Sequence, residues 1–155
     1  MPKFQALETS FVRTLQAGGV DANDQPAERL TSDGTGNPCR HCLREIPAGQ
    51  QMLVLAHRPF KTVQPYAEVG PIFICADPCN RPPDTSHLPE ILKTSPDYLI
   101  KGYDHDERIV YGTGAVVAQA ALSDQIDHIL SSPRVAFVHV RSARNNCYQV
   151  RAEPD

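Results

Sequence analysis

Five cysteines give this sequence its clearest potential for chemistry. Four of them form two close pairs, Cys39 and Cys42 with C-x2-C spacing and Cys75 and Cys79 with C-x3-C spacing. A structural Zn²⁺ takes four ligands in a tetrahedron, and a close pair of cysteines supplies two thiolates from one short loop. The second pair comes directly after the apolar run IFI, so both pairs can meet at the ends of neighbouring strands. The pattern favours a structural zinc site formed by these four residues.

Two other uses of the thiols stay open from the sequence. The C-x3-C spacing and the 32 residues between Cys42 and Cys75 are not a standard zinc-ribbon spacing, so unliganded thiols are one alternative. A redox pair at Cys39 and Cys42 is another, although prolines on both sides leave little room for the helix that a thioredoxin-type pair begins. Cys147 is expected to be a small buried side chain in a strand, or a replacement ligand for Cys75. His41 is expected to be exposed, because four ligands complete a tetrahedral site.

A second group of residues with chemical potential lies in the segment VAFVHVR, residues 135–141. Side chains alternate between the two faces of a strand, so His139 and Arg141 share one face while the opposite face is wholly apolar. A cation two residues away lowers the pKa of a histidine and keeps it neutral near pH 7. A neutral imidazole beside a guanidinium can bind an anion, with the histidine as donor or base. The alternative is a solvent-exposed strand end at which Arg141 pairs with a carboxylate.

Other polar residues near expected strand ends extend this candidate pocket, since such positions often line ligand sites. The candidate pocket residues are Arg58, Tyr66, Glu68, Tyr111, His139 and Arg141. They would serve an enzyme that acts on a small acidic substrate. No nucleophile elbow, phosphate loop, H-E-x-x-H motif or catalytic triad is present, so the sequence assigns no catalytic residue.

The sequence pattern also predicts the helices and strands that position these residues. At the N-terminus we expect a strand over Lys3–Leu7, a short helix over Glu8–Ala17 that ends at the two glycines, and a polar surface loop over residues 20–37. Strands are expected at Met52–Ala56 and in GPIFICA, followed by a proline-rich irregular stretch from 78 to 96 with one helical turn near Leu88–Leu92.

The C-terminal third predicts a β-β-α-β-β order. The expected elements are strands at Tyr98–Tyr103 and Arg108–Val117, a helix that Ser123 caps, and strands at 135–141 and 147–153. Two glycines inside the second of these strands suggest a bulge. The whole pattern indicates an α+β fold built on a mostly antiparallel sheet.

Length and composition limit the classes of function. The chain has 155 residues and is expected to be a single domain, and its 14 prolines favour short strands over long helices. A net charge of −3 argues against nucleic-acid and membrane partners. No apolar segment of secretory or transmembrane length is present, so we expect a cytoplasmic protein with reduced thiols. Pairing of edge strands in a homodimer is a general possibility.

Four segments resemble one bacterial family, named domain of unknown function 1203. They are PCRHCLREIPAGQQMLVLAHRPF, PYAEVGPIFICADPC, RIVYGTG and VAFVHVRSARNNCY. The resemblance covers most of the chain and implies a single small α+β domain, but no activity. In that family the position of Cys75 is often histidine. Cysteine there keeps a zinc ligand and weakens a role for this position as a catalytic base.

These observations predict a binding or accessory module that a structural zinc stabilises. The alternatives from other classes are a small-substrate enzyme with an anion-binding pocket around His139 and Arg141, and a thiol redox protein that uses Cys39 and Cys42.

Overall fold

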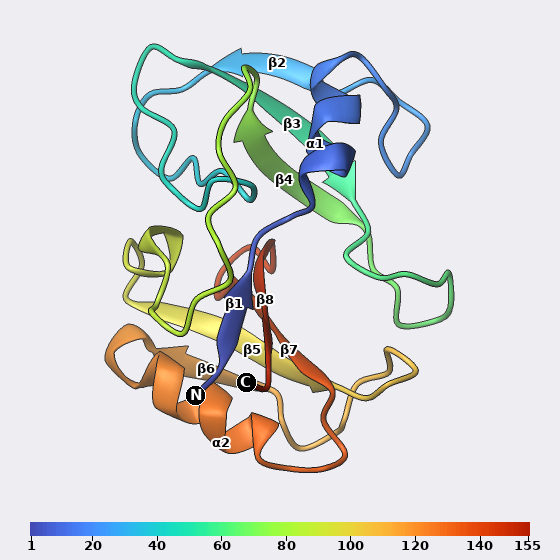
Figure 1. Cartoon of the computed structure of the whole chain (residues 1–155), viewed down its shortest axis with the longest axis vertical. Coiled ribbons are helices and arrows are strands. Elements are labelled where there is room, and N and C mark those ends of the chain that lie inside the picture. The colour runs from blue at the N-terminus through green and yellow to red at the C-terminus, as the bar shows by residue number, and fades with distance from the viewer.

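The computed structural model describes residues 1–155 and has the predicted α+β architecture, with two α-helices and eight strands in two antiparallel sheets (Figure 1). In chain order the elements are β1 (Lys3–Gln5), α1 (Thr9–Gln16), β2 (Glu28–Thr31), β3 (Gln51–His57), β4 (Gly70–Cys75), η1 (Glu90–Leu92), β5 (Asp97–Tyr103), β6 (Ala115–Ala118), η2 (Gln119–Ala121), α2 (Leu122–Leu130), β7 (Phe137–Ser142) and β8 (Tyr148–Glu153). Neither α-helix has the length and apolar character that crossing a membrane would require.

The larger sheet has five strands in the order β1-β8-β7-β5-β6, and α2 covers one of its faces (Figure 1). On β7 the side chains of Val138 and Val140 lie on this face and are fully buried. The helix contributes Leu122, Ile126 and Ile129, whose spacing of three and four residues places them on one side of the helix. Together these residues belong to a core cluster of 17 buried residues.

The opposite face of the larger sheet is aromatic and cationic. The register places Lys101 of β5 and Arg151 of β8 directly opposite His139 of β7, and directly paired residues share a face. Residues 58–69 cover this face, and this connection between β3 and β4 contains no helix or strand of its own. Within it, the Phe60 ring lies 5.1 Å from the His139 ring and 5.3 Å from the ring of Tyr103. We call residues 58–69 the cover segment.

The smaller sheet has three strands in the order β2-β3-β4, and α1 lies beside it (Figure 1). The α1 residues Val12 and Leu15 belong to a second core cluster of 11 buried residues, which also contains Cys39. The backbone of Cys39 forms an isolated parallel β-bridge with Phe73 of β4. The β3–β4 register places Met52 opposite Cys75. The first cysteine pair therefore lies against the end of the strand that precedes the second pair.

Three expectations about local structure differ from the structure. Residues 20–37 include the strand β2, whose four residues are all exposed, so no apolar alternation marked it. The strand expected over residues 108–117 is reduced to β6, because a turn from Val110 to Thr113 with Gly112 at φ +97° interrupts it. Ser123 does not cap α2, since a 3₁₀ turn precedes the helix and Ala121 is its first flanking residue.

Candidate metal centre and buried polar cluster

The sulfur atoms of the two cysteine pairs converge on one point in space. The Sγ atoms of Cys39, Cys42, Cys75 and Cys79 all lie within 4.8 Å of one another, and no disulfide links them. The Cys39–Cys79 distance is 3.9 Å and the Cys42–Cys75 distance is 4.0 Å. A tetrahedron with Zn–S bonds of about 2.3 Å has S–S edges of about 3.8 Å. The two distances are close to this edge length and none of the six exceeds 4.8 Å, so the four sulfurs are close enough to ligate one metal ion.

A tight turn positions the first cysteine pair. Leu43 has φ +59°, and its backbone N–H donates to the Cys39 carbonyl over 2.9 Å. The backbone N–H groups of Cys42 and Cys75 point at Cys39 Sγ, with N–S distances of 3.5 and 3.3 Å. Hydrogen bonds from the thiols of Cys42, Cys75 and Cys79, together with the Cys42 backbone N–H, hold the pKa of the Cys39 thiol well below its usual value. These groups favour the ionised form of Cys39 over the neutral thiol.

Helix α1 holds the second cysteine pair from outside. Arg13 donates from Nη2 to the Cys79 carbonyl over 2.7 Å, and Gln16 donates from Nε2 to the Cys75 carbonyl over 2.9 Å. Gln16 also donates to the Asp77 carbonyl over 3.0 Å. These bonds fix the backbone between the two cysteines, where no regular element would otherwise constrain it.

His41 is buried, so the expectation that it faces solvent is wrong. Its Nδ1 lies 3.0 Å from Cys79 Sγ, and its Nε2 lies 2.9 Å from Thr9 Oγ1. Burial lowers the pKa of His41, and the neutral ring has one N–H to donate. The Thr9 hydroxyl and the Cys79 thiol can each donate or accept, so the tautomer of His41 decides the direction of both bonds. His41 contacts Cys79 and is not one of the four clustered residues.

Cys147 does not belong to this group. Its Sγ lies 3.7 Å from the Asn145 carbonyl, in the turn between β7 and β8, and the residue is half-buried just before β8 begins. Both sequence-based expectations for it, a buried strand position and a replacement ligand for Cys75, are wrong.

His139 and Arg141 lie side by side on the covered face of β7, and neither is at a solvent-exposed strand end. Their exposed fractions are 0% and 4%. Glu68 of the cover segment reaches them, with Oε2 3.6 Å from Arg141 Nη1 and Oε1 3.4 Å from Lys101 Nζ. A second bond of Arg141 runs from Nη1 to the Asn146 carbonyl over 3.2 Å.

The other expected pocket residues separate into two places. Arg58 is half-buried at the start of the cover segment. Tyr66 and Tyr111 instead contact each other at the surface, with 3.0 Å between their hydroxyl oxygens, and Tyr111 is 73% exposed. The structure therefore joins Glu68, His139 and Arg141, and leaves the tyrosine pair on the outside.

Sequence reasoning missed the aromatic surroundings of His139. Its ring lies 4.9–5.1 Å, centroid to centroid, from four aromatic rings. These are Phe60, Tyr103, Phe137 and Tyr148. Burial lowers the pKa of His139 well below its usual value, and Arg141 lowers it further. Alternation along β5 and β8 could have placed Tyr103 and Arg151 on this face, whereas the arrival of Phe60 depends on the path of a loop.

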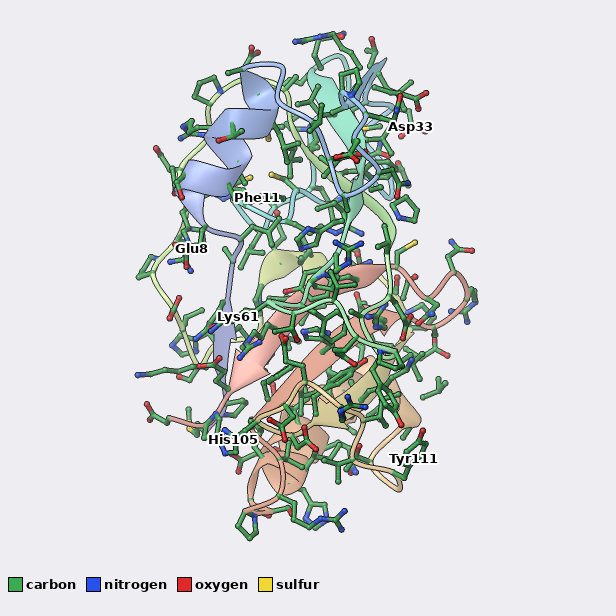
Figure 2. All side chains as sticks on the ribbon, turned by 90° about the vertical axis from the view of Figure 1, so that its right-hand side faces the viewer. Glu8, Phe11, Asp33, Lys61, His105 and Tyr111 are labelled. Atoms are coloured by element: carbon green, nitrogen blue, oxygen red, sulfur yellow. The ribbon has the colours of Figure 1, made fainter.

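His57 was also missed, and it connects this region to the surface. Burial lowers its pKa to about 4, with Arg40 and Arg141 contributing, and its ring lies 5.7 Å from that of Tyr148. An open pocket of about 350 Å³ lies beside it. Its lining includes Phe11, His57, Arg58, Phe60, Tyr148 and Arg151. Figure 2 labels two residues that line this pocket, Phe11 on the α1 side and Lys61 on the side of the larger sheet.

Comparisons with known proteins give one result. A family model described as "Protein of unknown function (DUF1203)" matches residues 36–153. No curated protein and no solved structure matches the chain significantly. The matched range contains the four clustered cysteines as well as His57, His139 and Arg141.

Proposed function

Because the chain belongs to the DUF1203 family of proteins of unknown function, its role has to be inferred from its own side chains, and we propose that it is a zinc-stabilised binding module. The observation that carries the proposal is the cluster of four thiols within 4.8 Å of one another. Sites with four sulfur ligands in a tetrahedron hold zinc or iron. Four protein ligands also close the coordination sphere, which is typical of structural sites, whereas catalytic zinc keeps an open position.

The zinc would stabilise the smaller of the two sheets. The core cluster there has only 11 buried residues, and small cores commonly need a metal or other cross-link. A metal at the four thiols would join the turn at 39–42 to the end of β4, where α1 already binds the backbone. The proposed role is thus to fix α1 and the smaller sheet as one unit.

The thiol redox alternative has weaker support. Cys39 is fully buried, and its Sγ lies 3.9 Å from that of Cys79, outside the proposed redox pair. A redox-active cysteine needs access for its substrate, and redox sites are partly exposed. We therefore keep the structural metal as the proposal, together with a reducing compartment such as the cytoplasm, in which the thiols stay available for the metal.

Metal analysis of protein purified without added zinc tests the proposal. We expect one zinc per chain, and chelation should lower the melting temperature because the ligands bind metal only in the folded state. Cys42→Ser should lose the zinc, whereas Cys147→Ser should keep it, since Cys147 lies outside the cluster. Iron in place of zinc would refute the choice of metal. Metal-free protein with an unchanged melting temperature would refute the site.

A further inference from the structure

Buried polar atoms without a partner within the protein are concentrated in one region. Eight side-chain nitrogen or oxygen atoms are buried and make no hydrogen bond, and all but Glu45 Oε1 belong to the same five residues. These residues, which we call the buried polar cluster, are His57, Arg58, Tyr103, His139 and Arg141. An unsatisfied buried polar group destabilises the folded state, and native proteins have only a few per hundred residues. Such a concentration in one place indicates a site that a ligand completes.

Arg141 shows which chemistry would complete it. The guanidinium uses Nη1 for the Asn146 carbonyl and Glu68, while Nε and Nη2 have no partner within the protein. Nε–H and the adjacent Nη2–H point in parallel and form the edge of the guanidinium that binds two oxygens of one carboxylate or phosphate. Tyr103 and His139 lie on the same face of the sheet with free polar atoms of their own.

The local charge favours an anion. Arg141 and Lys101 share one carboxylate, that of Glu68. Arg58 of the cluster makes no ion pair, so the positive charges outnumber the negative ones. His57 and His139 add none, because burial and neighbouring cations keep both rings neutral. Four aromatic rings enclose His139, and burying a doubly charged group in such weakly polar surroundings costs more than burying a singly charged one. A carboxylate therefore fits better than a phosphate dianion.

We propose that the buried polar cluster binds a small monocarboxylate, with both of its oxygens on the Nε–Nη2 edge of Arg141 and with Tyr103 and His139 as additional donors. This names the ligand class of the binding module, and it rests on that part of the proposed function alone, because the cluster shares no residue with the zinc site. The rings of Phe60 and Tyr148 would contact the apolar part of the ligand.

The proposed ligand would reach the buried polar cluster beneath the cover segment. His57, Arg58, Phe60 and Tyr148 line the open pocket of about 350 Å³, and the last two also contact His139. The cover segment has no helix or strand to unfold, so it can move aside while both sheets stay intact. The ligand would enter from this pocket and pass between the cover segment and β8.

Calorimetric titration of the zinc-loaded protein with sodium propionate tests the proposal, with propionamide and inorganic phosphate as comparison probes at matched ionic strength. We expect propionate to bind, propionamide not to bind and phosphate to bind more weakly. Arg141→Lys keeps the charge but loses the two-donor edge, and should bind propionate at least about tenfold more weakly. Arg144→Lys is the matched control, since Arg144 is an exposed arginine of the same β7–β8 hairpin and pairs with Asp97.

A second variant covers the case in which Arg141→Lys does not fold. Tyr103→Phe removes one hydroxyl from the cluster, keeps the ring, and should weaken propionate binding about fivefold. Zinc content is measured on each sample, so that loss of the metal site and loss of carboxylate binding can be distinguished. No propionate binding by the wild-type protein would overturn the proposal and leave water as the occupant. Equal binding by wild type and the folded variants, or a preference for phosphate, would overturn it as well.

Discussion

His139 is an ionisable residue placed where it cannot easily ionise. It lies between aromatic rings on β5, β7, β8 and the cover segment, with both ring nitrogens free of protein partners. A residue chosen for stability alone at this position would be apolar. The placement of the histidine agrees with the proposed carboxylate site, and it has measurable consequences for stability.

Replacing His139 with leucine should stabilise the ligand-free protein. Leucine has a similar volume and removes two buried nitrogens that lack partners, each of which costs about 1–3 kcal/mol. The loss of the ring contacts with four aromatic side chains offsets part of this gain. We therefore expect the free energy of unfolding to rise by about 1–2 kcal/mol, measured by urea denaturation at pH 7.5. The same variant should bind propionate more weakly. A decrease in stability would show that the imidazole has partners that the structure does not contain.

Stability should fall as the pH drops below about 6.5. The pKa of His57 in the folded state is lowered to about 4 and that of His139 lies well below 6.5, so the unfolded chain takes up protons first. The groups that face His139 are Arg141, Arg151, His57 and Lys101, and all of them disfavour its protonation. Each of these two histidines therefore lowers the free energy of unfolding by about 1.4 kcal/mol at pH 5.5 relative to pH 8. Denaturation of zinc-saturated protein between pH 8 and 5.5 should show this loss, with a shallower slope for His139→Leu.

At the scale of elements, one carboxylate fastens the cover segment. Glu107, at φ +62°, accepts hydrogen bonds from the backbone N–H groups of Lys61 and Thr62 and from the Thr62 hydroxyl, at 2.9–3.0 Å. Burial would raise the pKa of Glu107, but the bonds from these two residues lower it. A residue in a left-handed conformation is thus tied to a loop that has no regular structure of its own.

Glu107→Gln should loosen the cover segment selectively. The amide keeps the shape of the side chain but turns one acceptor into a donor that faces other donors, so the bonds to Lys61 and Thr62 are lost in part. We expect exchange of these two amide protons to become at least about tenfold faster, as measured by hydrogen–deuterium exchange, with little change in β7. Asp106→Ala is the control, since its side chain is exposed beside Glu107.

Sequence patterns predicted the regular elements better than the connections. Alternation in residues 135–141 and helical spacing around Ile126 indicated β7 and α2, because both elements bury one face. The strand β2 was missed because it is exposed throughout, and the 108–117 strand was predicted too long because a turn at Gly112 interrupts it. Paired spacing alone suggested all four clustered cysteines, whereas Phe60, His57 and His41 depend on long-range contacts that no local pattern encodes.

At the scale of the whole molecule, Arg40 joins the two sheets. It is buried next to Cys39, and it donates from Nε to the Tyr148 carbonyl of β8 and from Nη1 to the Pro38 carbonyl, both over 2.8 Å. Burial lowers its pKa to about 10, so it stays charged at neutral pH. The four-cysteine cluster of the smaller sheet and the edge of the polar cluster are thereby linked through one side chain.

Arg40→Lys should destabilise the protein by about 2–4 kcal/mol, because lysine cannot make both bonds and hydrogen bonds from a charged group contribute about 1.5–3 kcal/mol each. Arg44→Lys, an exposed arginine four residues along the chain, should change stability by less than about 0.5 kcal/mol. Urea denaturation of the zinc-loaded proteins measures both. Equal effects of the two substitutions would show that Arg40 does not connect the sheets.

The pairing of β1 with β8 brings the two ends of the chain together, with Lys3 opposite Glu153 (Figure 1). Lys3 and Asp155 also form an ion pair at 3.1 Å. A short flexible linker can therefore join residues 155 and 1, and the chain can be opened instead in the exposed turn at Asn23. The result is a circular permutant in which both cysteine pairs and every member of the polar cluster keep their order along the chain. This topology makes the protein a natural candidate for insertion into a surface loop of another protein.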